Sequence, residues 1–164
     1  MNVENDLVAV ALRIEEVPWD HTDAEALRAA MAAEVGPRYA DRAADLARTQ
    51  ANAVDPDTVH RTIVVYAGDT PVGHAAVRWN AGDLELKRMF VHPDHRGTGV
   101  STALLTASEH AARELGLPRL ILQTGDRQPD AVRLYEKSGY TRIPIFPPYE
   151  AMPFSNTFEK VFTG

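Results

Sequence analysis

The chain has 164 residues, of which 45% are apolar, and this size and composition predict one domain that spans residues 1–164. Its 17 Lys and Arg against 23 Asp and Glu give a net charge of −6, which disfavours nucleic acid or an anionic membrane as a partner. The absence of cysteine excludes disulfides, thiolate metal ligands and a cysteine acyl-enzyme. Because there is no long apolar run and no basic leader, we expect a soluble, cytoplasmic protein.

The first third of the chain predicts one strand and two helices. Residues 7–14 alternate loosely between apolar and polar side chains, as a strand does. Thr22-Asp23-Ala24-Glu25 fits a capping box that opens a helix, and Gly36-Pro37 ends this helix. A second helix of small residues is expected from Asp41 to a point before Asp55-Pro56.

The middle of the chain predicts three consecutive antiparallel strands. β-Branched and aromatic residues dominate 62–66 and return in 72–79, with the turn residues Gly68-Asp69 between the two runs. A third strand is expected over 84–92.

The last third predicts two helices and three strands. A helix from Val100 to Leu115 followed by a strand over 120–123 forms a β-α-β crossover, so the strands on either side of this helix should be parallel neighbours. Pro129 fits the first turn of another helix. Strands are expected again over 140–145 and 157–162. The sum is an α+β fold around a mixed, mostly antiparallel sheet.

The most informative segment is the glycine-rich loop Arg96-Gly97-Thr98-Gly99-Val100-Ser101-Thr102, between a predicted strand and a predicted helix. Glycines and a helix N-terminus make an anion site that suits a pyrophosphate, although such a loop can also merely turn the chain. A Walker A loop is excluded because the loop contains no lysine. A dinucleotide fingerprint is excluded because Thr102 replaces its third glycine and Leu122-Gln123-Thr124 stands where an acidic residue is expected at the end of the next strand.

Two motifs resemble the GCN5-related N-acetyltransferase (GNAT) family: Arg96-x-x-Gly99-x-Ser101, and Leu134-Tyr135-Glu136-Lys137-Ser138-Gly139-Tyr140 further along. Order and spacing agree over about residues 84–144. Ser101 departs from the family's Gly or Ala, and Gln128 stands where many relatives have Asn. The resemblance implies the acyl-CoA N-acyltransferase fold, with about four helices flanking the sheet.

The resemblance also implies acetyl-CoA as cosubstrate. The strand that ends near Val91 should carry a bulge and splay from the strand at Leu120, so that the N–H groups of Met89 and Val91 face a cleft. The implied cofactor-binding residues are Met89, Phe90, Val91, Arg96, Gly97, Thr98, Gly99, Val100, Ser101, Thr102, Gln128 and Tyr135.

Two side chains are candidates for catalysis. Family members often place a general base at the position of Glu85; the alternative is a solvated strand glutamate paired with Lys87 or Arg88. Tyr135 would act as general acid toward the departing coenzyme A sulfur; the alternative is a helix tyrosine that packs its ring on the sheet.

The acceptor is expected opposite the cofactor, at the substrate-binding residues Tyr39, Glu85, Phe146 and Tyr149. The proline-rich segment 143–149 would form an aromatic wall over the cleft, or else a loop that covers a sheet edge. The partner would be a small-molecule or peptide amine. A homodimer through the C-terminal strands would use an apolar face of Phe154, Phe158 and Phe162.

Other polar residues have simpler interpretations. His92-x-x-His95 has a spacing compatible with metal, but a Pro-Asp turn separates the two residues and we expect no metal site. His74 is expected to be a packed or exposed strand histidine rather than to face the acceptor. Arg127 and Arg133 are either solvated or screen cofactor phosphates.

The function expected from the resemblance is an acetyl-CoA-dependent N-acetyltransferase that moves an acetyl group directly to a primary amine, since no cysteine exists to carry it. One alternative is a noncatalytic acyl-CoA-binding module. The others are transfer of another acyl group and transfer to a hydroxyl. The sequence does not separate them.

Overall fold

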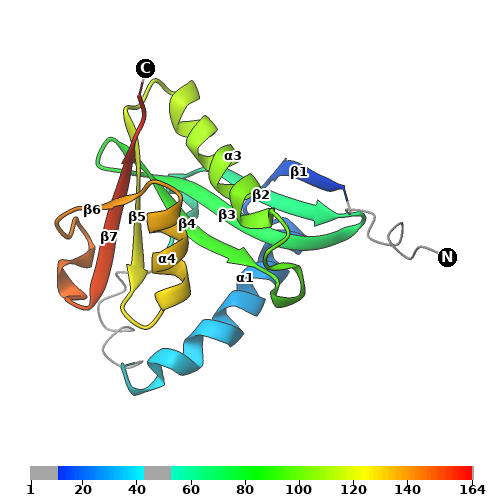
Figure 1. Cartoon of the computed structure of the whole chain (residues 1–164), viewed down its shortest axis with the longest axis horizontal. Helices are drawn as coiled ribbons and strands as arrows, with labels where there is room; N and C mark the ends of the chain where they lie inside the picture. Colours follow the sequence, from blue (N-terminus) through cyan, green and yellow to red (C-terminus); the bar gives the residue numbers. More distant parts are fainter. Residues whose placement is uncertain (1–10, 43–52, 164) are drawn as a thin grey trace.

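The computed structural model describes residues 11–42 and 53–163, and these residues form a seven-stranded mixed sheet in the order β1-β2-β3-β4-β5-β7-β6 (Figure 1). The α+β fold class is therefore confirmed. The predicted strand over 7–10 and the predicted second helix from residue 43 on lie outside the described residues. No helix in the described ranges is long and apolar enough to cross a membrane.

The first four strands form an antiparallel meander. β1 (Leu12–Val17) pairs with β2 (Val59–Ala67), which pairs with β3 (Thr70–Asn80), which pairs with β4 (Asp83–Val91). The three predicted strands over 62–92 are thus confirmed. β1 runs three residues beyond the expected end at Ile14.

The second half of the sheet contains its one parallel pair. β5 (Arg119–Gly125) runs parallel to β4, and α3 (Val100–Glu114) connects them as the predicted crossover. β7 (Ser155–Val161) is antiparallel to β5, and β6 (Thr141–Arg142) pairs with β7. The strand expected over 140–145 is shorter because Pro144 has no N–H group to continue the ladder.

Three α-helices cover the sheet in the described ranges (Figure 1). α3 and α4 (Pro129–Lys137) pack on one face, and α1 (Thr22–Val35) packs on the other. The capping box predicted at Thr22 is wrong: the Nδ1 atom of His21 accepts the Asp23 N–H at 3.1 Å and caps α1. Gly36–Arg42 continues as a 3-10 helix, where a second α-helix was expected to begin at Asp41.

Two apolar cores lie on opposite faces of the sheet. In β2, Ile63 and Val65 face α3, whereas Val64 and Tyr66 face α1. Phe158 is fully buried in the α3 core, so it is not available to the predicted apolar face, whereas Phe154 and Phe162 are partly exposed.

Gly73 sets how closely α3 approaches the sheet. A Cβ atom on Gly73 would lie 2.5 Å from Cγ1 of Val100, the first residue of α3. Glycine therefore allows the N-terminus of α3, and with it the glycine-rich loop, to rest against β3 beside the end of β4.

Candidate active site where β4 and β5 diverge

β4 and β5 pair only at their beginnings. Leu84, Glu85 and Leu86 are in register with residues 120–122. Beyond this point β4 continues to Val91 and β5 to Gly125 without pairing with each other. The β3–β4 register shifts between His74 and Ala76, and Arg88 has a positive φ of 55°. This is a β-bulge at the point of divergence. The structure thus has the bulge and the splay that the resemblance implied.

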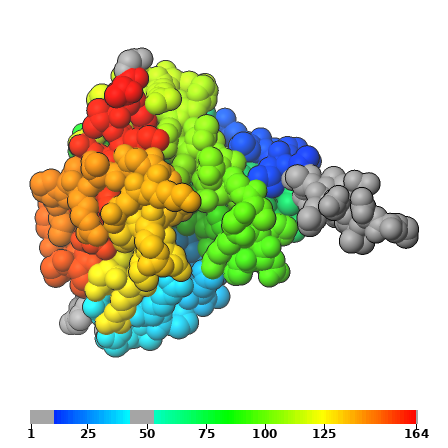
Figure 2. Space-filling model, in the orientation of Figure 1, coloured from blue at the N-terminus to red at the C-terminus, as the bar shows by residue number. Residues whose placement is uncertain are grey.

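Two adjoining cavities occupy the divergence, where α1, α4 and the loop before α3 meet around a hollow in the surface (Figure 2). We call them the loop cavity, lined by Arg96, Gly97 and Ser101, and the inner cavity, lined by Lys87, Gln123 and Phe154. Residues common to both walls are Met31, Val35, Met89, Gln128, Ala131 and Tyr135. The two cavities therefore meet at Met89 and Tyr135.

The glycine-rich loop has the conformation that an anion site requires. Gly97 and Gly99 have positive φ angles of 77° and 92°, and Gly99 caps α3 without a side-chain hydrogen bond. The first N–H groups of α3 have no acceptor within the helix. They therefore remain available at the positive end of the helix dipole, next to the loop cavity.

Eight of the twelve predicted cofactor residues line the loop cavity: Met89, Phe90, Val91, Arg96, Gly97, Ser101, Gln128 and Tyr135. The other four do not line it. Val100 is buried beneath the loop, and the hydroxyl of Thr98 donates to the His95 carbonyl. Gly99 and Thr102 shape the loop and the first turn of α3.

Arg96 forms an ion pair across the loop cavity. Its Nη2 atom lies 2.7 Å from Oε2 of Glu34 on α1, and its Nε donates to the Val91 carbonyl at 3.1 Å. Glu34 also lines this cavity. Glu34 was not predictable from the sequence, because nothing in the pattern of α1 indicates which residue reaches a loop 62 positions away.

His74 fixes the orientation of the peptide between Arg88 and Met89. Arg28 can only donate, so His74 Nε2 accepts from it at 3.0 Å and Nδ1 carries the proton that it donates to the Arg88 carbonyl at 2.7 Å. In a planar trans peptide the carbonyl and the next N–H point in opposite directions. The Met89 N–H therefore points away from His74 and the α1 layer. His74 is thus a packed strand histidine, one of the two expected forms.

Burial keeps His74 neutral. The side chain is fully buried, which lowers its pKa to about 4, and the neighbouring guanidinium groups of Arg28 and Arg88 act in the same direction. The neutral ring with its proton on Nδ1 is therefore the form present near neutral pH.

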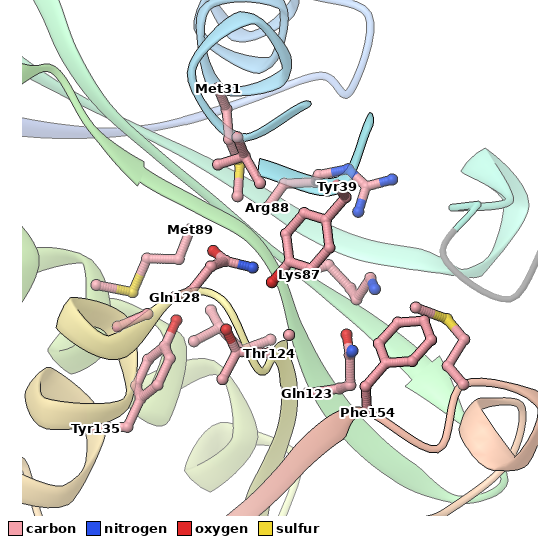
Figure 3. Close-up of a pocket in the computed structure, with 15 residues that line it drawn as sticks. Met31, Tyr39, Lys87, Arg88, Met89, Gln123, Thr124, Gln128, Tyr135 and Phe154 are labelled. Atoms are coloured by element: carbon pink, nitrogen blue, oxygen red, sulfur yellow. The ribbon is translucent and has the colours of Figure 1, made fainter. Parts of the chain in front are cut away.

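Tyr135 directs its hydroxyl into the cavities. Its ring packs against Tyr140 and Phe158, and Figure 3 shows the hydroxyl pointing toward the space beside Gln128. Burial raises the pKa of Tyr135, so the phenol stays protonated and can donate. The two interpretations of Tyr135, as a packed ring and as a donor in the cleft, are compatible with this geometry.

Glu85 is fully buried and lines neither cavity. Its carboxylate accepts from Arg78 Nε at 3.0 Å, from Asn80 Nδ2 at 3.1 Å and from the Tyr149 hydroxyl at 2.5 Å. The alternative of a solvated glutamate is therefore wrong. The assignment of Glu85 as general base stays a prediction, and it needs an intermediary between the carboxylate and an acceptor.

The other three predicted acceptor residues occupy different positions. Tyr39 lines the inner cavity, and its hydroxyl accepts the Arg127 N–H at 3.0 Å over Gly125, where a Cβ atom would lie 2.1 Å from that oxygen. Tyr149 is fully buried behind the cavity wall. Phe146 packs on Tyr149 and lines a separate groove with the proline-rich segment.

Lys87 is the principal site residue that the sequence analysis missed, since it was considered only as a partner for Glu85. It lines the inner cavity with 4% of its surface exposed, and its Nζ donates to the Tyr149 hydroxyl at 2.7 Å. Burial lowers the pKa of Lys87 to about 7. In the sequence Lys87 stands mid-strand between Leu86 and Arg88, so no local pattern distinguishes it from the other charged residues of β4.

The remaining predicted residues have structural partners. His92 caps a short 3-10 turn through Nδ1, and no group of three potential metal ligands occurs among the described residues. Arg127 pairs with Asp41, and Arg133 pairs with Asp130 on α4. Neither arginine lines a cavity.

A family model described as the acetyltransferase (GNAT) family matches residues 19–140. The match includes β4, the glycine-rich loop, α3, β5 and α4, and covers well over half of the chain. The chain therefore belongs to the acetyltransferase (GNAT) family.

Curated relatives match over part of their length. The IAA acetyltransferase of Azospirillum brasilense is 38% identical over 102 residues, which are 61% of this chain and 67% of that protein. The protein YjcF of Bacillus subtilis strain 168, an uncharacterized N-acetyltransferase, is 40% identical over 78 residues, which are 48% of this chain and 54% of YjcF. The chain thus aligns with about half to two thirds of these relatives.

Solved structures match over nearly the whole chain. A provisionally assigned acyl-CoA N-acyltransferase from Klebsiella pneumoniae subsp. pneumoniae MGH 78578 superposes with a TM-score of 0.74 at 28% identity, covering 93% of this chain and 98% of that one. The PaiA N-acetyltransferase of Thermoplasma acidophilum in complex with coenzyme A has a TM-score of 0.67 at 16% identity, covering 93% and 99%. The fold is that of the acyl-CoA N-acyltransferases.

Proposed function

We propose that this protein is an acetyl-CoA-dependent N-acetyltransferase that moves an acetyl group directly to a primary amine. The observation that carries the proposal is the meeting of the two cavities at the bulged end of β4. There the Met89 N–H and the Tyr135 hydroxyl flank a passage between an anion-binding loop and a second, deeper space. One cavity suits the donor and the other the acceptor.

The loop cavity fits the diphosphate end of acetyl-CoA. Gly97 and Gly99 have no side chain that would stand between backbone and ligand, and the N–H groups of Val100 and Ser101 are at the helix N-terminus. Arg96 and Arg38 add positive charge to the same wall. Acetyl-CoA supplies the activated thioester when it is bound, and these groups would hold its phosphates.

Two groups would act on the reacting carbonyl and sulfur. A backbone N–H aimed at a developing oxyanion contributes about 3 kcal/mol to catalysis, and Met89 is the candidate because His74 holds its N–H away from the α1 layer. Tyr135 would donate a hydrogen bond to the sulfur as the C–S bond breaks. Since burial disfavours its phenolate, stabilisation by that hydrogen bond matters more than complete proton transfer.

The inner cavity would hold the acceptor. Tyr39, Met152 and Phe154 form an apolar wall, while Gln123 and Thr124 offer hydrogen bonds. An amine placed there would approach the shared residues Met89 and Tyr135 from the side opposite the phosphates. Direct transfer in a ternary complex follows, since the chain has no cysteine to carry the acetyl group.

The test has two stages. Calorimetric titration should show binding of acetyl-CoA and desulfo-CoA but not of ATP. A panel of primary amines is then screened with a thiol reagent, which reports only released coenzyme A because the protein has no cysteine. Amine-dependent thiol release supports the proposal. Tight acetyl-CoA binding without release for any amine favours the noncatalytic binding module, and failure of acetyl-CoA to bind overturns both.

A further inference from the structure

A chain of hydrogen bonds leads from the inner cavity to the buried carboxylate of Glu85. Lys87 Nζ, in the cavity wall, donates to the Tyr149 oxygen at 2.7 Å, and the Tyr149 hydroxyl donates to Glu85 Oε2 at 2.5 Å. These residues come from β4 and from the turn Tyr149–Ala151. These hydrogen bonds connect Glu85, the predicted base, which lines neither cavity, with the amine of Lys87, which lines the inner cavity.

The donors and acceptors in this chain fix its proton arrangement. The Tyr149 oxygen accepts from Lys87 and from Arg78 Nη2 at 3.1 Å, so its single proton goes to Glu85. Burial and the neighbouring Glu85 carboxylate raise the pKa of Tyr149, which keeps this proton in place. A neutral lysine has two N–H groups to donate and still retains one lone pair.

We propose that Lys87 is the general base of the reaction, and that Tyr149 and Glu85 position its amine at the inner cavity. The inference rests on the proposed function and deepens it. Lys87 is two residues before Met89 on β4, and both line the inner cavity, so the amine lies on the acceptor side of the reacting centre. Figure 3 shows the Lys87 side chain running beside Tyr39 in this part of the cavity.

The step balances with the groups present. The acceptor nitrogen forms a bond to the acetyl carbon, and one of its N–H protons passes to the neutral Lys87 Nζ, which becomes an ammonium ion. The C–S bond then breaks and its electron pair leaves with the sulfur, toward which Tyr135 donates its hydrogen bond. The ammonium of Lys87 returns its proton to solvent after the product leaves.

The surroundings of Lys87 decide its charge. On β4, Glu85 favours the ammonium form and Arg88 opposes it; from β3, Arg78 also opposes it; and from the turn, Tyr149 is a neutral phenol. Burial is the largest influence and favours the neutral amine, so the pKa is lowered to about 7. The neutral amine that a general base requires is therefore favoured more than it would be in an exposed lysine.

Direct titration of Lys87 is the first test. The chain contains only three lysines, Lys87, Lys137 and Lys160, so a protein labelled at the lysine side chains gives three NMR signals, assigned by Lys137→Arg and Lys160→Arg. One signal should titrate near pH 7 and disappear in Lys87→Met. A Lys87 signal that titrates above pH 9 overturns the inference.

Kinetics with the best acceptor is the second test. Lys87→Met should lower kcat at least about 100-fold with the Kd of acetyl-CoA unchanged within twofold. Lys87→Arg should fail equally, because a guanidinium keeps the charge but cannot accept a proton. Rescue by arginine would indicate a merely electrostatic or structural role and overturn the inference. Lys137→Met, on the exposed end of α4, is the matched control.

The pH dependence of kcat separates Lys87 from Glu85 as base. Wild-type kcat should rise through pH 7, and Glu85→Gln should move this rise to lower pH, because the carboxylate raises the pKa of Lys87. Tyr149→Phe tests the same chain if Glu85→Gln does not fold; it should lower kcat while leaving acetyl-CoA binding intact. Full activity of Lys87→Met with loss of activity in Glu85→Gln would assign the base to Glu85 and overturn the inference.

Failure of the inference is distinguishable from failure of the proposed function. An enzyme that acetylates amines but whose Lys87 titrates above pH 9 keeps the function and loses the inference. A protein that binds acetyl-CoA and acetylates no amine loses both.

Discussion

The two cavities that meet at Met89 and Tyr135 are built in different ways. The loop cavity takes most of its anion-binding groups from one continuous segment, Arg96 to Ser101, and uses mainly backbone N–H groups at the start of a helix. The inner cavity is built from side chains of α1, β4, β5, α4 and the segment around Met152, with buried charges behind its wall. A local backbone site tolerates changes elsewhere, whereas a site of side chains from distant segments depends on the packing of all of them.

The largest expected effect concerns His74, which supports the bulge that both cavities share. Its folded-state pKa of about 4 lies below the ordinary value of 6.5. The contribution of the neutral ring to the free energy of unfolding is therefore fully present above pH 6.5 and is lost as the pH falls toward 4. Between neutral pH and pH 4 the free energy of unfolding should fall for both proteins, but the fall should be about 3 kcal/mol smaller for His74→Gln than for wild type, because glutamine does not titrate. Urea unfolding at several pH values measures this.

The control for this experiment is His110→Gln, because His110 is exposed on α3. It should follow the wild-type pH dependence. If His74→Gln and wild type lose the same stability between pH 7 and pH 4, His74 is not held neutral, and its assigned hydrogen bonds to Arg28 and Arg88 are wrong.

The second effect separates chemistry from binding at the junction of the cavities. Tyr135→Phe should lower kcat about 100-fold, because the hydrogen bond to the departing sulfur is lost, and should leave the Kd of acetyl-CoA within about twofold. Tyr140→Phe removes a similar hydroxyl, one that donates to Glu109 at 2.9 Å outside both cavities, and should leave kcat unchanged. An unchanged kcat in Tyr135→Phe would contradict the role of this phenol.

The third effect tests the backbone character of the loop cavity. Gly99→Ala forces a side chain into a φ of 92° and should weaken acetyl-CoA binding about tenfold, with a smaller change in kcat at saturation. Gly82→Ala is the matched control, since Gly82 has a φ of 89° in the β3–β4 turn with open space around it. Equal loss of binding in both variants would indicate general destabilisation instead of a phosphate site.

The smallest effect concerns the Arg96–Glu34 pair at the mouth of the loop cavity. Glu34→Gln releases Arg96 and removes a negative charge near the phosphates, so acetyl-CoA should bind about two- to threefold more tightly at low salt. The gain should shrink as salt is added. Weaker binding would mean that Glu34 holds Arg96 in place for the ligand.

What could be predicted from the sequence follows the same contrast between a local site and a site assembled from distant segments. The glycine-rich loop, the β-α-β crossover and the position of Tyr135 were predictable because their signals are local: two glycines before a helix, apolar periodicity and a compact motif. The burial of Glu85 was not, because it depends on Arg78, Asn80 and Tyr149, which surround it only once the sheet has formed.

Two further residues show what local patterns leave out. The cap of α1 is His21 rather than Thr22. The His21 ring accepts the Asp23 N–H, and the Glu25 N–H, which the Thr22 hydroxyl was expected to accept, bonds the His21 carbonyl instead. Lys87 reads as one more charged residue in a strand. Only the position of Tyr149 above it, 62 residues later, shows that its amine is buried at the cavity.

The most direct measurement of the central claim is a titration of the 15N-labelled protein with acetyl-CoA, followed by the backbone amide signals. We predict that the largest shifts fall on Gly97, Val100 and Ser101 at the loop and on Met89 at the bulge, with small shifts at the Gly82 turn. Shifts confined to other surfaces, or none at saturating acetyl-CoA, would contradict the assignment of donor site and reacting centre to the divergence of β4 and β5.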